Sequence, residues 1–451
     1  MKETILELIE KKDYRKIKEL LLEENSADIA ELFEDLPDKA AILVFRLLPK
    51  DVCAEIFAYL SAETHTVLIN AFTDAEIRTM LSELYLDDTV DILEELPASF
   101  VARILKNADE QTRREINQLL NYPENSAGSI MTTEYVTLSA ESTIEEAFVN
   151  LRKVSIDKET IYTCYVTEKR KLIGVVTVKD MLIASEDLKI GDIMETNVIS
   201  ANVHADREEV AVMFDKYDFL AIPIVDNDDR LVGIVTVDDA IDVLRSSATE
   251  DIEVMAAITP GPKSYLRTGV FELVLKRIPW LLLLMISATF TGGIITSFEK
   301  SLGVLPILTA YIPMLMDTGG NAGGQASATI VRCLALGEVK GSDIFRIVFK
   351  EARVAILCGT ILALVNFAKI MLLDRLILGN TSISLSVAAT VCITLALTVI
   401  IAKIVGCSLP IGAKRIGLDP AVMASPFITT IVDALALMAY FKVAVTLIEN
   451  L

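Results

Sequence analysis

The segment PMLMDTGGNAGGQASATIVRCLA (Pro313–Ala335) is apolar enough for a membrane, yet it contains an Asp, an Asn, a Gln and four glycines. A carboxylate is costly at membrane depth, and freed backbone groups are tolerated there only when they are buried in protein or line a cavity. The glycines permit the helix to unwind, or permit a neighbouring helix to approach closely. Carboxylate, amide and carbonyl oxygens suit a hard cation such as Mg²⁺ or Ca²⁺. We therefore expect a broken span on a cation path, with Asp317, Asn321 and Gln325 as candidate ligands.

The second half of the chain contains five long apolar runs, of which this segment is part of the second. A helix needs ~20 such residues to cross the hydrocarbon core, so the sequence predicts five transmembrane helices. Basic residues gather before the first run and in alternate loops, which places those loops in the cytoplasm and the C-terminus outside. The runs are Trp280–Phe298, Val304–Leu336, Val354–Leu373, Leu385–Val405 and Ala421–Ile448.

A second acidic side chain, Asp433, lies near the middle of the last apolar run. No basic residue is close to it on its own helix, so an ion or another helix must compensate its charge. Because Mg²⁺ sheds water reluctantly, one or two carboxylates are enough to hold the hydrated ion. If two subunits pair, their Asp433 carboxylates could face each other across one axis.

The charge of the chain is divided unevenly between its halves. The 451 residues carry a net charge of −21, while residues 1–270 alone carry −25 and the remainder +4. Such an acidic surface disfavours nucleic acid and attracts cations. The beginning, MKETILELIEKKDYRKIKEL, lacks the apolar core of a signal peptide, so we expect the acidic half in the cytosol. Six cysteines without CxxC spacing and only two histidines argue against disulfides or a zinc site.

Apolar residues recur with a period of twelve in residues 1–128, for example at Leu32, Val44, Ile56 and Leu68. Prolines follow several of these units, where proline can end one helix and begin the next. A short helix of this kind cannot bury its own apolar face, but stacked copies can. The pattern predicts an acidic α-helical solenoid.

A second internal repeat covers residues 129–256. IMTTEYVTLSAESTIEEAF (Ile130–Phe148) returns as IMETNVISANVHADREEVAVMF (Ile193–Phe214), and KLIGVVTVKDML (Lys171–Leu182) returns as RLVGIVTVDDAI (Arg230–Ile241). Each copy predicts a strand, a helix, two β-branched strands and another helix.

This repeat resembles a tandem pair of cystathionine-β-synthase-type (CBS) domains, an α/β module that often binds adenine nucleotides. The resemblance places Thr236 and Asp239 where the family contacts ribose and phosphate, with Thr177 and Asp180 as their counterparts in the first copy. Residues 257–279 contain a Pro-Gly-Pro break and then a basic segment, which we expect to form a juxtamembrane connecting helix.

With the solenoid, the CBS pair, the five spans, TGGNAGGQ and LDPAVMASPFITTIVDALAL in this order, the whole chain resembles the MgtE family of bacterial magnesium channels or transporters. The resemblance implies a multi-pass homodimer in the plasma membrane, with an all-α membrane domain (residues 280–451) and a pore along the dimer interface. Asp433 would be the central ligand, Asn321 and Gln325 would lie on the pore side, and Asp419 would lie at the cytoplasmic start of the fifth span. Asp317 stands where some relatives have glycine.

The same resemblance implies that intracellular Mg²⁺ bridges acidic residues of the cytosolic half and favours a closed pore. A ligand shifts such an equilibrium only by binding one state better than the other. Ser247 departs from the pattern, because relatives can carry an acid there. The matching residues here are Asp87, Asp91, Asp206, Glu208, Asp218, Asp239, Asp242, Glu250 and Asp251.

The leading interpretation is a Mg²⁺-selective channel or transporter for passive influx, closed by intracellular Mg²⁺, with an adenine nucleotide such as ATP as a modulator. A divalent ion entering a cell gains about 4.6 kcal/mol per 100 mV, so no pump motif is needed. The alternative is a CBS-regulated transporter of another divalent cation or an osmolyte. The sequence speaks against an anion carrier, because no basic residue lies in the middle of a span. Lys369, Lys403 and Lys442 lie nearer helix ends and can snorkel. An intramembrane protease using Asp317 and Asp433 lacks the GxGD signature, so we expect no enzyme.

Overall fold

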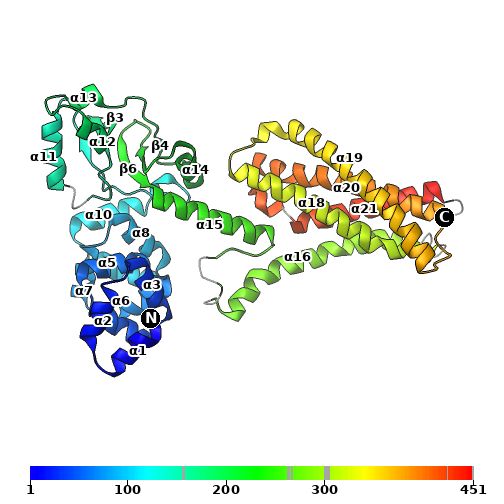
Figure 1. Ribbon diagram of the computed structural model, residues 1–451, viewed down its shortest axis with the longest axis horizontal. Helices are drawn as coiled ribbons and strands as arrows, with labels where there is room; N and C mark the ends of the chain where they lie inside the picture. Colours follow the sequence, from blue (N-terminus) through cyan, green and yellow to red (C-terminus); the bar gives the residue numbers. More distant parts are fainter. Residues whose placement is uncertain (155–157, 262–264, 266–267, 299–304, 424, 449–451) are drawn as a thin grey trace. The chain divides into compact units, whose positions relative to one another are not determined.

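The computed structural model describes residues 1–154, 158–261, 265, 268–298, 305–423 and 425–448 (Figure 1). The chain forms two compact units, Met1–Leu244 and Arg245–Leu451. The helix α15 (Val237–Met255) runs across the boundary between the two units. Each unit is described separately below.

The first unit begins with short helices whose first residues are twelve positions apart, so the predicted repeat is confirmed. In the described residues 1–120 these helices are α1 (Lys2–Glu10), α2 (Tyr14–Leu21), α3 (Ser26–Asp35), α4 (Asp38–Phe45), α5 (Lys50–Ala58), α6 (Ala62–Ala71), α7 (Asp74–Leu81), α8 (Leu86–Glu95), α9 (Ala98–Asn107) and α10 (Glu110–Leu119).

Proline and apolar side chains explain this regularity. Pro37, Pro49 and Pro97 occupy the N-cap positions of α4, α5 and α9, in extended backbone that cannot continue the preceding helix. The periodic apolar residues form the shared core, where the Phe45 ring lies 5.8 Å from Phe33 and 6.1 Å from Phe57. Each helix therefore buries its apolar face against its neighbours, as in a solenoid.

The CBS pair has the order of elements that the repeat predicts. The first copy contains β1 (Thr137–Leu138), α11 (Ile144–Val154), β2 (Thr163–Glu168), β3 (Lys171–Thr177) and α12 (Val178–Ile183). The second contains β4 (Ala201–Asn202), α14 (Arg207–Tyr217), β5 (Ala221–Val225), β6 (Leu231–Thr236) and α15, after the short helix α13 (Ile190–Ile193). In each sheet a parallel pair is followed by an antiparallel pair, in the order β1-β2-β3 or β4-β5-β6.

The two CBS copies exchange the segments that precede their first strands. Thr132, in the segment before β1 of the first copy, pairs with Ile234 in β6 of the second copy, and Glu195, in the segment before β4 of the second copy, pairs with Val175 in β3 of the first. The methionines of the repeated IM motif follow the same exchange. A Cβ on Gly233 would lie 2.5 Å from the Met131 Sδ, and a Cβ on Gly174 would lie 2.7 Å from the Met194 Sδ. At both positions, a methionine of the other copy therefore occupies the space that a Cβ would need.

The second unit consists of long helices. The described residues form α16 (Val270–Ser297), α18 (Ile312–Ala335), α19 (Ile344–Lys369) with a π-helical continuation (Ile370–Ile377), α20 (Leu385–Arg415) and α21 (Ser425–Leu447). Short 3₁₀ turns cover Pro306–Tyr311, Gly341–Asp343 and Pro420–Met423. Figure 1 shows α18, α19, α20 and α21 running alongside one another.

Four stretches of the described residues are long and apolar enough to cross a membrane: Val270–Ser297, Gly341–Ile377, Leu385–Arg415 and Pro420–Leu447. The prediction of five spans is thus confirmed for four of them. The remaining one, α18, is also long enough at ~1.5 Å per residue, but its polar side chains lower its hydropathy. The expected boundary between juxtamembrane helix and first span, at residues 279 and 280, lies inside α16, which continues through Pro279.

The expected break in the second span is wrong, because α18 is one continuous α-helix. Its glycines serve close packing instead. A Cβ on Gly319 would lie 2.7 Å from the Thr398 Cγ2, and a Cβ on Gly323 would lie 2.6 Å from the Ile428 Cγ2. The glycine face of α18 thus allows α20 and α21 to pack at close range.

Candidate metal centres

The helix α18 presents its carboxylate and its two side-chain amides on one face. Asp317, Asn321 and Gln325 are exposed and follow each other at intervals of four residues, while Gly319, Gly320 and Gly323 on the other face are buried. Residues four apart lie above one another on an α-helix. The three candidate ligands of the second span therefore form a continuous row of oxygen-bearing side chains on the open side of this helix.

Asp433 lies on α21, next to Val432, whose side chain contacts the glycine face of α18. It is partly buried. Of the lysines in the neighbouring spans, Lys369 pairs with Asp374 at 2.9 Å and Lys403 pairs with Glu351 at 3.6 Å, so neither pairs with Asp433. The expectation that Lys403 snorkels is wrong, because this side chain is only 9% exposed.

Asp419 lies at the start of the 3₁₀ turn that precedes α21. It is exposed, and it accepts a hydrogen bond from the backbone N–H of Ala421 at 2.8 Å. Its carboxylate therefore faces solvent beside the beginning of α21, with one oxygen engaged in capping the turn.

An acidic cavity of about 530 Å³ lies in the first unit, between the solenoid and the CBS pair. Four of the predicted sensor residues line it: Asp87 and Asp91 on α8, and Asp239 and Asp242 on α15. Thr236 also lines it, and its hydroxyl donates to the Asp239 carboxylate at 2.6 Å. Further carboxylates that line the cavity are Glu55, Glu83, Asp88, Glu95, Glu159 and Asp238.

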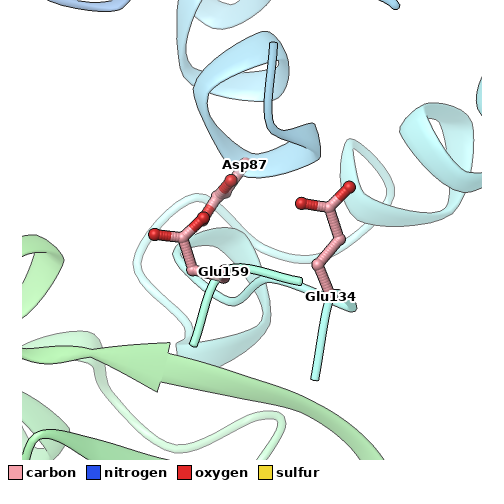
Figure 2. A group of neighbouring side chains, drawn as sticks. All are labelled: Asp87, Glu134 and Glu159. Atoms are coloured by element: carbon pink, nitrogen blue, oxygen red, sulfur yellow. The ribbon is translucent and has the colours of Figure 1, made fainter. Parts of the chain in front are cut away.

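Three carboxylates gather most closely at the edge of this cavity (Figure 2). Oxygens of Asp87, Glu134 and Glu159 all lie within 4.8 Å of one another, close enough to hold one metal ion. Asp87 belongs to α8 of the solenoid, whereas Glu134 and Glu159 lie in loops of the first CBS copy, joined by a 3.0 Å hydrogen bond from the Glu159 N–H to the Glu134 carbonyl. One oxygen each of Glu134 and Glu159 is fully covered and has no hydrogen-bond partner among the described residues.

The carboxylates of the cavity repel one another in the absence of a cation. Burial, followed by repulsion from Asp88, raises the pKa of Glu159 to about 8. Burial likewise raises the pKa of Glu134 to about 7, and burial and then Asp238 raise the pKa of Asp239 to about 7. The pKa of Asp87 lies well above its ordinary value, through burial and then repulsion from Asp239. A divalent cation bound among these carboxylates would stabilise their charged forms and so lower these pKa values.

The other predicted sensor residues lie outside the cavity. Asp206 caps α14 by accepting from the Glu208 N–H at 2.8 Å, and Asp218 ends the same helix in left-handed backbone; all three residues are exposed. Glu250 and Asp251 lie on the part of α15 that belongs to the second unit.

Asp87, Glu134 and Glu159 are called the triad below. Two of its residues, Glu134 and Glu159, were not predicted from the sequence. Glu134 is a lone acid within the first IMTTE motif, and Glu159 lies in a loop without a repeat partner. The signal that could have found Glu134 is the acid of the second motif, IMETN, where Glu195 stands two positions earlier in the motif.

Comparison with known families gives a consistent result along the chain. Residues 24–125 match the MgtE intracellular N domain, residues 127–187 and 190–246 match the CBS domain, and residues 312–443 match MgtE, described as a divalent cation transporter. The chain is 36% identical over 451 residues to the magnesium transporter MgtE of Thermus thermophilus, covering 99% of this chain and 98% of that protein. It is 33% identical over 425 residues to the magnesium transporter MgtE of Bacillus subtilis, covering 94% and 92%.

Two solved structures resemble the part outside the membrane helices. One is the cytosolic domain of the Mg²⁺ channel MgtE in complex with ATP, at 36% identity and a TM-score of 0.52, covering 54% of this chain and 100% of that structure. The other is the soluble part of a magnesium transporter, at 33% identity and a TM-score of 0.51, covering 55% and 98%. From the three matched domain types and the relatives aligned over nearly their whole length, the chain belongs to the MgtE family of divalent cation transporters.

Proposed function

We propose that this chain carries Mg²⁺ passively into the cell, driven by the membrane potential, and that intracellular Mg²⁺ closes the path. The observation that carries the transport proposal is the row of Asp317, Asn321 and Gln325 on the open face of α18. Such a row is unfavourable against lipid, so it requires water or protein opposite it. The names of the relatives, as magnesium transporters, support Mg²⁺ as the ion.

The path is proposed to lie between two copies of the chain. Asp317, Asn321 and Gln325 on the open face of α18 are exposed, and α16 has no fully buried residue in a single chain. A symmetric pair would place two polar rows and two Asp433 carboxylates around one axis. Hydrated Mg²⁺ needs only one or two carboxylates, because its water can contact the amide oxygens. The chain is proposed to cross the membrane with its N-terminus in the cytoplasm and its C-terminus outside.

Closure is proposed to begin at the acidic cavity of the first unit. The carboxylates of the solenoid and the CBS pair repel each other when no cation is bound, and Mg²⁺ between them would favour the compact arrangement. Asp206, Glu208, Asp218, Glu250 and Asp251 are proposed as further sensor ligands. ATP is proposed as a modulator of the CBS pair, near Thr236 and Asp239, on the strength of the related cytosolic domain that was solved with ATP.

The proposal is tested with purified protein in liposomes that contain a fluorescent Mg²⁺ indicator. A K⁺ diffusion potential, negative inside, should start Mg²⁺ entry, and reversing its sign should stop it. Addition of Mg²⁺ on the side of the cytosolic half should slow entry. Uptake that ignores the sign of the potential would exclude passive influx, and identical rates with and without Mg²⁺ on the cytosolic side would exclude the closure mechanism.

A further inference from the structure

An ion pair lies inside the second unit, away from the polar face of α18. Glu351 of α19 and Lys403 of α20 face each other, with 3.6 Å between the Glu351 Oε2 and the Lys403 Nζ. Their side chains are only 16% and 9% exposed, and the Oε2 has no hydrogen-bond partner among the described residues. Burying two charges in this way often costs as much as the pair returns, so stability alone does not account for the pair.

Lys403 lies on the part of α20 that packs against the glycine face of α18, opposite the row of candidate ligands. One turn beyond Lys403, a Cβ added to Gly406 would lie 2.3 Å from the carbonyl oxygen of Gly323 in α18. The carbonyl of Ala402, next to Lys403, lies 3.2 Å from a Cβ on Gly323. Gly323 itself stands between Asn321 and Gln325. The backbones of α18 and α20 are therefore in close contact beside Lys403, and neighbouring helix axes that pack in this way lie ~10 Å apart.

A single positive charge at that distance acts differently on different ions. Its repulsion is proportional to the charge of the passing ion, so a divalent cation is opposed twice as strongly as a monovalent one. Glu351 cancels this charge in the intact pair. If Glu351 were neutral, Lys403 would raise the barrier for Mg²⁺ most. If Lys403 were neutral, any charge left on Glu351 would attract cations and favour divalent ones.

We propose that Glu351 and Lys403 form a specificity-determining pair that keeps the field beside α18 neutral for a divalent cation. This inference rests on the proposed function, because it concerns ions that pass along α18. Neither residue touches the ion. Both act through the electrostatic field and through the contact between α19, α20 and α18.

The test measures Mg²⁺ uptake into liposomes by four variants. Glu351→Gln leaves the Lys403 charge alone and should raise the Mg²⁺ concentration for half-maximal uptake on the order of tenfold. Lys403→Met should leave this concentration at or below that of the wild type. The double variant Glu351→Gln/Lys403→Met and the exchanged pair Glu351→Lys/Lys403→Glu should both return it to within about threefold. Lys350→Met and Glu338→Gln, which change exposed residues of the same unit, serve as controls and should match the wild type.

If the pair acted only through packing, both single variants would change the half-maximal Mg²⁺ concentration in the same direction. If both single variants raise the half-maximal concentration alike, or if the double variant remains as impaired as Glu351→Gln, the inference is wrong. The exchanged pair keeps this test decisive where a single variant fails to fold, since its net charge equals that of the wild type. Absence of uptake by the wild type would instead refute the proposed function itself.

Discussion

Replacing Glu159 by Gln removes one charge from the triad of Asp87, Glu134 and Glu159 and keeps the size of the side chain. The pKa of Glu159 rises from 4.5 to about 8 in the folded protein, through burial and then repulsion from Asp88. A carboxyl whose pKa is raised by folding contributes stability that is complete below its unfolded pKa and is lost as the pH rises through the folded value. Without divalent cations, a fragment of residues 1–257 should therefore become less stable as the pH rises from about 4.5 to about 8.

The size of the effect follows from the same pKa. Each pKa unit corresponds to ~1.4 kcal/mol, so the rise from 4.5 to about 8 sets an upper limit of about 5 kcal/mol. Neighbouring carboxylates can move apart and take up water, so we expect Glu159→Gln to stabilise the folded state by about 2 kcal/mol at about pH 8.5 in EDTA. For a fragment of this size, that is an increase in Tm of roughly 4–8 °C.

The assay is thermal unfolding of a fragment comprising residues 1–257, measured by circular dichroism in EDTA or in excess MgCl₂. The parent fragment should gain stability from Mg²⁺, and Glu159→Gln should gain much less, because one ligand of the triad is gone. Glu145→Gln, on the exposed face of α11, is the matched control and should behave like the parent. The reasoning fails if Glu159→Gln is no more stable than the parent at about pH 8.5 in EDTA and responds to Mg²⁺ equally.

Other changes test the membrane unit and the solenoid. Asp433→Asn should reduce Mg²⁺ uptake into liposomes at least about tenfold, while the protein still elutes from a size-exclusion column at the wild-type volume. Unchanged uptake would show that Asp433 does not line the path of the ion. Gly406→Ala should impair uptake and lower the Tm, because the new Cβ would lie 2.3 Å from the Gly323 carbonyl, whereas Gly412→Ala, with no atom within 4 Å, should be neutral. Phe45→Ala should destabilise the soluble fragment by about 3–5 kcal/mol in urea unfolding, and a loss below ~1 kcal/mol would contradict its place in the core.

Repetition in the sequence made the folds of the solenoid and the CBS pair predictable. The helices of the solenoid begin at the predicted interval, because a twelve-residue unit with apolar side chains at fixed positions can bury them only against identical neighbours. The CBS pair was predictable for the same reason, since each copy confirmed the pattern of the other. Single-copy features carried no such signal.

The packing of the membrane unit could not be predicted in the same way. In α18 the glycines were compatible with either an unwound helix or close packing, and only the positions of Thr398, Ile428 and Val432 decide for packing. Lys403 looked like a residue near a helix end, but its partner Glu351 lies on another helix. The contacts that decide these cases join residues far apart in the chain, and sequence spacing does not report such contacts.

The exchange of leading segments between the CBS copies limits how the two halves can evolve. Met131 rests on a glycine of the second copy and Met194 on a glycine of the first, so each half completes its partner's packing instead of its own. Replacing Gly174 would require a compensating change 20 positions away, and replacing Gly233 one 102 positions away, in each case in a motif that belongs to the opposite half. A half inherited without the other would lack the segment that pairs with its β3 or β6. The duplicated module is therefore expected to be gained, lost and transferred only as a whole.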